Sequence, residues 1–238
     1  MTINPELTIV LPSKNEEENI GRTVEGILAQ DYPAMKNTRI ILADNHSTDR
    51  TREVFLSFQN RALVEIVDGG LPSIARNCGA RVATSEYVLF LDADVLLGDS
   101  SSIRKAVELA QRKDLDCVTA RLQCRDGNWK DHFLYFMTNR IITCSKWWRP
   151  FSTGAFMLFK KETFDRLGGF NEKVHFAEDY FLSKQVKPRK FGVAKTFFYT
   201  DNRRFKKTGY WKMIRMFLNT AIHSNDPEYF YRDHKYFD

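Results

Sequence analysis

The first residues with the potential for chemistry are two aspartates, Asp92 and Asp94, which follow the apolar run at residues 87–91. Alternate residues of an extended segment point the same way, so both carboxylates are expected to face one site. Two such groups repel each other unless a cation or hydrogen-bond donors offset the repulsion, and Mg²⁺ often combines one or two carboxylates with phosphate oxygens. The pattern therefore favours a metal held against a diphosphate. A polar turn that caps the next helix is the alternative.

Two further polar clusters also follow strand-like runs. Residues 12–16 (Pro-Ser-Lys-Asn-Glu) come after the apolar run 7–11, and residues 44–49 (Asp-Asn-His-Ser-Thr-Asp) come after the run 39–43. In open parallel sheets, ligands bind beyond the carboxyl ends of the strands. The three clusters together predict one ligand site at that edge.

The elements that must position these clusters alternate along the first half of the chain. Strand-like runs at 7–11, 39–43, 63–67 and 87–91 are separated by helical spacing at 16–30, 49–58 and 74–83. Such alternation predicts right-handed βαβ units, and so an α/β fold with a mostly parallel, Rossmann-like sheet flanked by helices. In the second half of the chain, the same kind of pattern predicts helices at 101–112, 129–145, 177–186 and 210–222. It predicts strands at 116–124 and 155–159.

Composition places the chain among globular proteins. It is 43% hydrophobic, and no run approaches the roughly 18 consecutive apolar residues of a membrane span. No secretory signal is visible at residues 1–6, and the four cysteines form no CxxC pair, so we expect reduced thiols and a cytoplasmic location. Residues 183–222 carry eleven Lys/Arg against one acid, Asp201. This basic segment favours a phosphate-bearing ligand, a polyanion or the cytoplasmic face of an anionic membrane, with a solvated face as the alternative.

Six motifs, in this order, resemble those of family 2 glycosyltransferases, which have the GT-A fold and use nucleotide sugars. They are the strand and loop at 7–16, the Asp-Asn-His-Ser-Thr-Asp-Arg-Thr run at 44–51, Ala-Arg-Asn-Cys-Gly at 75–79, Asp-Ala-Asp at 92–94, Thr-Gly-Ala at 153–155 with Gly-Gly-Phe at 168–170, and Glu-Asp at 178–179. The resemblance covers about residues 7–186. It implies a catalytic domain at 1–190, with a nucleotide-binding half to about residue 98 and an acceptor half from about 99, followed by a basic, aromatic helical arm at 191–238.

The resemblance also implies roles on the donor side. The residues expected to bind the nucleotide are Pro12, Lys14, Asn15, Glu16, Asp44, Arg76 and Asp92. Asp44 offers a carboxylate that accepts a hydrogen bond from an N–H group of a base, and Arg76 offers a guanidinium that stacks on a base or pairs with phosphate. Asn45 and His46 depart from the Asp and Gly of many members, which leaves the identity of the base open. Thr48 and Asp49 are expected to cap the following helix.

On the chemical side, the family places a Glu-Asp pair at the start of a helix beneath the acceptor. Asp179 is the expected general base, because an acceptor hydroxyl must lose its proton as it attacks an anomeric carbon. Asp94 is the expected ligand of a divalent cation, Mn²⁺ or Mg²⁺, which neutralises the diphosphate leaving group. We expect Thr153, Gly154, Glu178, Arg203 and Arg204 at the acceptor or the diphosphate. The expected partners are a UDP- or GDP-sugar and a sugar or lipid-linked acceptor, and the reaction inverts the anomeric centre.

Two rival classes fit less well. A nucleotidyltransferase usually opens with a glycine-rich loop after its first strand, and residues 11–15 contain no glycine. A nucleic-acid-binding module would use the basic, aromatic residues 197–211, but it would leave the acidic clusters unexplained and no nucleic-acid partner is expected. For the segment from Arg203 to Ile222 three alternatives remain open: packing on the core, contact with an anionic membrane, or closure over phosphate.

Overall fold

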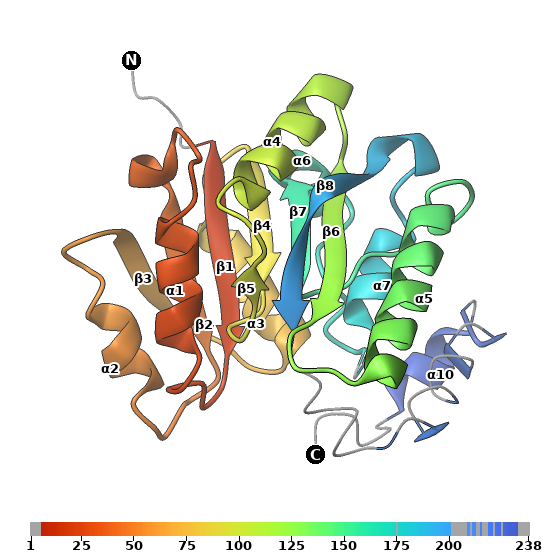
Figure 1. Ribbon diagram of the computed structural model, residues 1–238, viewed down its shortest axis with the longest axis horizontal. Helices are drawn as coiled ribbons and strands as arrows, with labels where there is room; N and C mark the ends of the chain where they lie inside the picture. Colours follow the sequence, from red (N-terminus) through yellow and green to blue (C-terminus); the bar gives the residue numbers. More distant parts are fainter. Residues whose placement is uncertain are drawn as a thin grey trace.

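A computed structural model describes residues 6–174, 176–200, 209, 211, 212, 215, 219, 220, 222–224 and 226–232. Within these residues an eight-stranded sheet runs through the molecule in the order β3-β2-β1-β4-β7-β6-β8-β5, with helices on both faces (Figure 1). Arg203, Arg204 and most of the helix expected at 210–222 lie outside the described residues. In the described part of the chain, no helix is long and apolar enough to cross a bilayer.

The first half of the sheet is parallel, as predicted. Strand β1 (Leu7–Ser13) lies between β2 (Arg39–Asp44) and β4 (Tyr87–Leu91), and β3 (Leu63–Asp68) pairs with the outer side of β2. Both faces of β1 are buried, which explains why its sequence is mostly apolar. Its odd-numbered side chains join one core cluster, whereas Val10 joins the cluster on the opposite face.

Short helices cover the two faces. Helices α1 (Ile20–Leu28), α2 (Thr51–Leu56) and α4 (Ser102–Lys113) lie on one face, and α3 (Pro72–Val82) packs on the other. Helix α1 buries Ile20, Val24 and Ile27, the spacing of a helix with one apolar face. Gly79 lets α3 approach β1, since a Cβ there would lie 2.3 Å from Cγ1 of Val10.

The second half adds antiparallel pairs. Strand β7 (Phe156–Lys160) runs antiparallel to both β4 and β6 (Cys117–Cys124), so the start of β7 lies beside the carboxyl end of β4. Helix α6 (Lys161–Arg166) follows β7 directly, and α5 (Trp129–Ser145) and α7 (Glu178–Ser183) lie near β6 (Figure 1). The start of β7 and the end of β4 therefore face a common site.

Residues 191–200 differ from the expected helical arm. They form strand β8 (Phe191–Thr200), which pairs parallel with β6 and antiparallel with the short β5 (Leu96–Leu97). Ala194, Thr196 and Phe198 are buried while Lys195 is exposed, so the basic residue occupies the outer side of an alternating strand. Helix α10 (Pro227–Tyr231) packs near the end of the described chain, with Phe230 against Val174 and Phe176.

Candidate functional site

Hydrogen bonds join the loops after β1 and β2 into one unit. The N–H of Asn15 donates to Oγ of Ser47 at 2.9 Å, and Oδ1 of Asn15 accepts from the N–H of Thr48 at 2.9 Å. Asn15 has a φ of 53°, in the left-handed region that Asn tolerates better than most residues. Lys14 and Asn15 are exposed, and Pro12 and Glu16 are partly buried. Four of the expected nucleotide-binding residues thus lie on one ordered loop.

Asp44 lies beneath these loops, and its carboxylate is not exposed at the surface where a nucleobase would bind. Its side chain is fully buried, and its two oxygens accept from Oγ of Ser47 at 2.5 Å and from the N–H of Ser47 at 3.1 Å. Arg52 lies 3.6 Å from the same carboxylate. In this geometry Asp44 holds the loop after β2 in place, and the base contact expected for it stays a prediction.

The start of α2 is also tied to the first loop. Oδ1 of Asp49 accepts from the N–H of Thr51 at 3.0 Å, and its Oδ2 accepts from the N–H of Glu17 at 3.1 Å. The N–H of Glu16 donates to Oγ1 of Thr51 at 2.7 Å. Asp49 thus links the beginning of α2 to the β1 loop, whereas Thr48 bonds Asn15 and caps no helix.

Arg76 connects helix α3 to the end of β4 and to the start of α7. Its guanidinium donates to Glu178 at 2.5 Å and to Asp92 at 2.8 Å, and it lies 5.5 Å from the ring centre of Phe170. Only 4% of Arg76 is exposed. Burial opposes the charge of Arg76, yet Asp92, Glu178 and Asp179 hold its pKa above the ordinary value. The guanidinium is therefore held in ion pairs with two carboxylates, and the contact with a base or a phosphate expected for it stays a prediction.

Next to these ion pairs, Gly154, which lies just before β7, contacts the start of α7. The N–H of Gly154 donates to Oδ2 of Asp179 at 2.7 Å, and the N–H of Tyr180 donates to Oδ1 at 2.7 Å. A Cβ on Gly154 would lie 2.5 Å from Nη2 of Arg76. Glycine is required here because the backbone passes directly over the guanidinium.

Asp179 has the electrostatics of a proton acceptor at neutral pH. Burial and then the Glu178 carboxylate raise the pKa of Asp179 to about 7, although the Gly154 N–H and Arg76 act in the opposite direction. A carboxyl group with such a pKa exchanges its proton close to physiological pH. Strongly raised values of this kind are frequent at functional sites.

Asp94 lies apart from the Arg76 network. It lines a small hollow of about 150 Å³ between α1, β5 and the end of β8, together with Arg22, Arg125 and Tyr199. No group of three or more Asp, Glu, His or Cys side chains that could hold a metal occurs among the described residues. Asp92 and Asp94 still fit a hard cation, because carboxylate oxygens are its preferred ligands and substrate phosphates supply others.

Sequence reasoning missed several residues at the site. Arg22 and Arg125 belong to elements far from Asp94 in the sequence, and no local pattern marks them. Phe170 and Asn77 lay inside recognised motifs without an assigned role. Thr153 has a buried Oγ1 that lacks a hydrogen-bond partner within the described residues.

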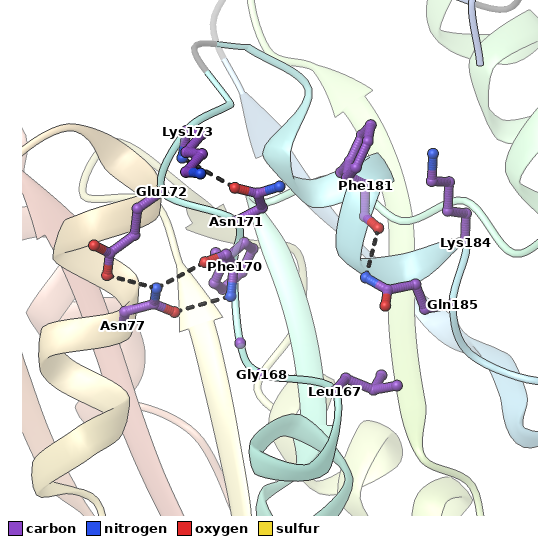
Figure 2. A pocket seen from close by; sticks show the side chains of 11 residues that line it. Asn77, Leu167, Gly168, Phe170, Asn171, Glu172, Lys173, Phe181, Lys184 and Gln185 are labelled. Atoms are coloured by element: carbon purple, nitrogen blue, oxygen red, sulfur yellow. Dashed lines mark hydrogen bonds between the residues drawn. The ribbon is translucent and has the colours of Figure 1, made fainter. Parts of the chain in front are cut away.

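Asn77 fixes the loop that carries Phe170. Its side chain donates to the Phe170 carbonyl at 2.8 Å and accepts from the Phe170 N–H at 2.9 Å (Figure 2). Phe170 in turn packs beneath Arg76. The hollow drawn in Figure 2, about 550 Å³ between α3, the 167–173 loop and α7, is lined by Asn77 and Phe170 but by none of the residues that the sequence assigned to the ligand site.

The model of the family described as "Glycosyl transferase family 2" matches residues 8–168. The chain belongs to glycosyl transferase family 2. The match covers every motif from the β1 loop to Gly168, and it confirms the family expected from the sequence.

Curated relatives carry related names. The chain is 24% identical over 202 residues to a poly(ribitol-phosphate) beta-glucosyltransferase of Bacillus spizizenii, which covers 82% of this chain and 32% of that protein. It is 24% identical over 197 residues to the O-antigen chain rhamnosyltransferase WbaN of Salmonella anatum, with 76% and 61% covered. A validoxylamine A glucosyltransferase of Streptomyces hygroscopicus is 36% identical over 98 residues, 40% of this chain and 23% of that protein. The chain thus spans less than two thirds of these relatives.

Solved structures share the fold. S. aureus TarS in complex with UDP-GlcNAc superposes with a TM-score of 0.66 at 19% identity, over 83% of this chain and 59% of that one. The mannosyltransferase PcManGT of Pyrobaculum calidifontis, in complex with GDP-Man and Mn²⁺, gives 0.66 at 24% identity, over 84% and 57%. The GT-A fold, a mixed α/β structure with a mostly parallel sheet, is confirmed.

Proposed function

We propose that this chain transfers a sugar from a nucleotide-diphosphate sugar to an acceptor hydroxyl, with inversion at the anomeric carbon. One observation carries the proposal: a carboxylate with a pKa of about 7, Asp179, lies under the Gly154 loop and is coupled through Arg76 to Asp92 at the end of β4. This arrangement supports Asp179 as a proton acceptor close to the proposed donor diphosphate.

On the donor side, the joined β1 and β2 loops would bind the nucleotide. Lys14, Asn15, Glu16 and Pro12 line the exposed loop, and Asp44 holds its shape from below. Asp94, with Asp92 beside it, would hold a divalent cation together with diphosphate oxygens. When bound, that cation would offset the negative charge that develops on the leaving group. We further propose that Arg203 and Arg204 meet the diphosphate.

On the acceptor side, Asp179 would take the proton of the attacking hydroxyl. The acceptor oxygen would form a bond to the anomeric carbon as the bond from that carbon to the diphosphate oxygen breaks. The nucleoside diphosphate then leaves, and attack from the opposite face inverts the centre. Arg76 would hold Asp92 and Glu178 in position during these changes, and Thr153 and Gly154 would form a tight loop beside the acceptor.

The relatives support the choice of substrates. Their names refer to polymer acceptors, poly(ribitol-phosphate) and an O-antigen chain, and the titles of the structural neighbours include UDP-GlcNAc and GDP-Man with Mn²⁺. We therefore propose a UDP- or GDP-sugar as donor, Mn²⁺ or Mg²⁺ as the cation, and a polysaccharide or lipid-linked acceptor.

A thermal-shift panel tests the donor side. UDP, GDP, CDP and dTDP are added separately, with Mn²⁺, with Mg²⁺ or with EDTA. A ligand that binds the folded state raises the melting temperature by mass action, so the cognate nucleotide should stand out and should depend on the metal. If no nucleotide shifts the transition with either metal, the proposed donor site is wrong.

A further inference from the structure

Helix α5 is folded with its polar side inward. Oη of Tyr135 lies 2.8 Å from Oγ1 of Thr200 in β8. The side chain of Asn139 bonds both the N–H and the carbonyl of Leu122 in β6, at 2.9 and 2.8 Å. Asp131 is buried in a capping box with Asn128. These bonds fix the rotation of the helix against the sheet.

The outward side of α5 and the turn after it are strongly apolar. A surface helix normally places its apolar stripe on the core and its polar residues in water. Here seven of the twelve large apolar side chains that are exposed among the described residues lie on this segment, all but Met137 with 56 to 81% exposure. We name them the α5 face: Trp129, Phe133, Phe136, Met137, Ile141, Trp147 and Trp148.

The charged side chains that are exposed on this segment are all cations. Lys130, Arg140 and Arg149 are exposed, whereas Asp131, the one acid between residues 127 and 154, is buried. Nζ of Lys130 lies 5.8 Å from the Trp129 ring, and Nζ of Lys146 lies 4.9 Å from the Trp147 ring. Tryptophan beside Lys or Arg on one helix face is the pattern of helices that lie in the headgroup region of a bilayer.

We propose that the α5 face docks on an anionic lipid surface. Figure 1 shows the helix toward the right-hand side of the molecule, beyond β6. A second copy of the chain fits less well, because a symmetric contact would bring Lys130 and Arg140 against other cations. Apolar insertion and attraction to anionic headgroups act together here, each adding to the affinity.

The proposal goes beyond sugar transfer and does not depend on it, so it can be tested without a substrate. All four tryptophans of the chain are more than 70% exposed, and three belong to the α5 face. Their fluorescence therefore reports directly on this surface. The full chain is titrated with vesicles of phosphatidylcholine, or of phosphatidylcholine with an equal amount of phosphatidylglycerol, at low and high salt.

We expect the anionic vesicles to move the tryptophan emission to shorter wavelength and to protect it from iodide quenching, with weaker partition at high salt because salt screens the charges. Phe133→Ser/Phe136→Ser and Lys130→Gln/Arg140→Gln should each partition at least tenfold less. Leu56→Ser/Leu63→Ser, a matched pair of exposed apolar residues elsewhere, should behave like the parent. Should the apolar variant fail to fold, the charge variant still decides the matter.

Three results would overturn the proposal. The first is no spectral change with either vesicle, and the second is equal partition onto neutral vesicles. The third is a dimer in solution that the Phe133→Ser/Phe136→Ser change converts to a monomer, since the face would then belong to a second copy.

Discussion

At the scale of single residues, Asp179 carries the chemical part of the proposal. Asp179→Asn keeps the size of the side chain but removes its ability to accept a proton, so kcat should fall on the order of 10²-fold or more. Nucleotide binding should persist in the thermal-shift panel, because Asp179 lies on the acceptor side. Asp165→Asn, an exposed acid on α6, serves as the control. Joint loss of catalysis and nucleotide binding would instead indicate a structural role.

The pH dependence follows from the same group. Burial and Glu178 raise the pKa of Asp179 to about 7, and a general base must be ionised to act. We therefore expect kcat/KM to rise with pH and to level off above about pH 7. Arg76 lowers this pKa, so Arg76→Gln should move the rising limb to higher pH, and Arg76→Lys should move it less. If the rising limb of the pH profile stays at the same pH in Arg76→Gln, Arg76 does not influence the pKa of the general base.

Gly154 offers a test of close packing at the site. Gly154→Ala places a methyl group 2.5 Å from Nη2 of Arg76 and so should disturb the contacts to Asp92 and Glu178. We expect a large loss of kcat and a destabilisation of about 1–3 kcal/mol in urea unfolding. Gly26→Ala in α1 is the matched control, because no atom lies within 4 Å of its added Cβ. Equal behaviour of the two variants would contradict the packing described here.

At the scale of elements, the Ala-Arg-Asn-Cys-Gly motif of α3 acts through three neighbours. Arg76 pairs with α7, Asn77 holds the loop before α7, and Gly79 meets β1. Asn77→Ala leaves the N–H and the carbonyl of Phe170 without their side-chain partner. This change should lower the free energy of unfolding by about 1–3 kcal/mol. Gln185→Ala, the control, removes one exposed hydrogen bond and should change the free energy of unfolding little. An Asn77→Ala variant with an unchanged free energy of unfolding would show that the loop keeps its structure without Asn77.

The sequence predicted these elements well where the signal was local. The helix expected at 129–145 matches α5, and the first four strands follow from short runs of mostly apolar residues. Strand β8 was missed because its partners, β6 and β5, are distant in the chain and its basic flanks suggested an exposed arm. Sequence reasoning likewise placed Arg76 at the site but not in ion pairs with Asp92 and Glu178. Burial of a charge depends on partners that only the tertiary structure supplies.

At the scale of the whole molecule, the chain spans only part of the length of its relatives. Its proposed substrates are therefore inferred from the site that this chain contains. Metal dependence is the broadest property that the site implies. EDTA should abolish transfer, and Asp94→Ala should reduce it on the order of 10²-fold while the melting temperature without ligand stays near that of the parent. Asp126→Ala, a neighbouring exposed acid at the same hollow, is the control. Full activity in EDTA would remove the metal from the mechanism.

The most direct test of the account is the release of nucleoside diphosphate from nucleotide sugars. Purified protein is incubated with UDP- and GDP-sugars, Mn²⁺ and a panel of sugar, polymer and lipid-linked acceptors, in parallel with Asp179→Asn. The account predicts acceptor-dependent release with one nucleotide, and release at least 10²-fold slower in the variant. No release above the blank with any donor, or equal release by Asp179→Asn, would contradict it.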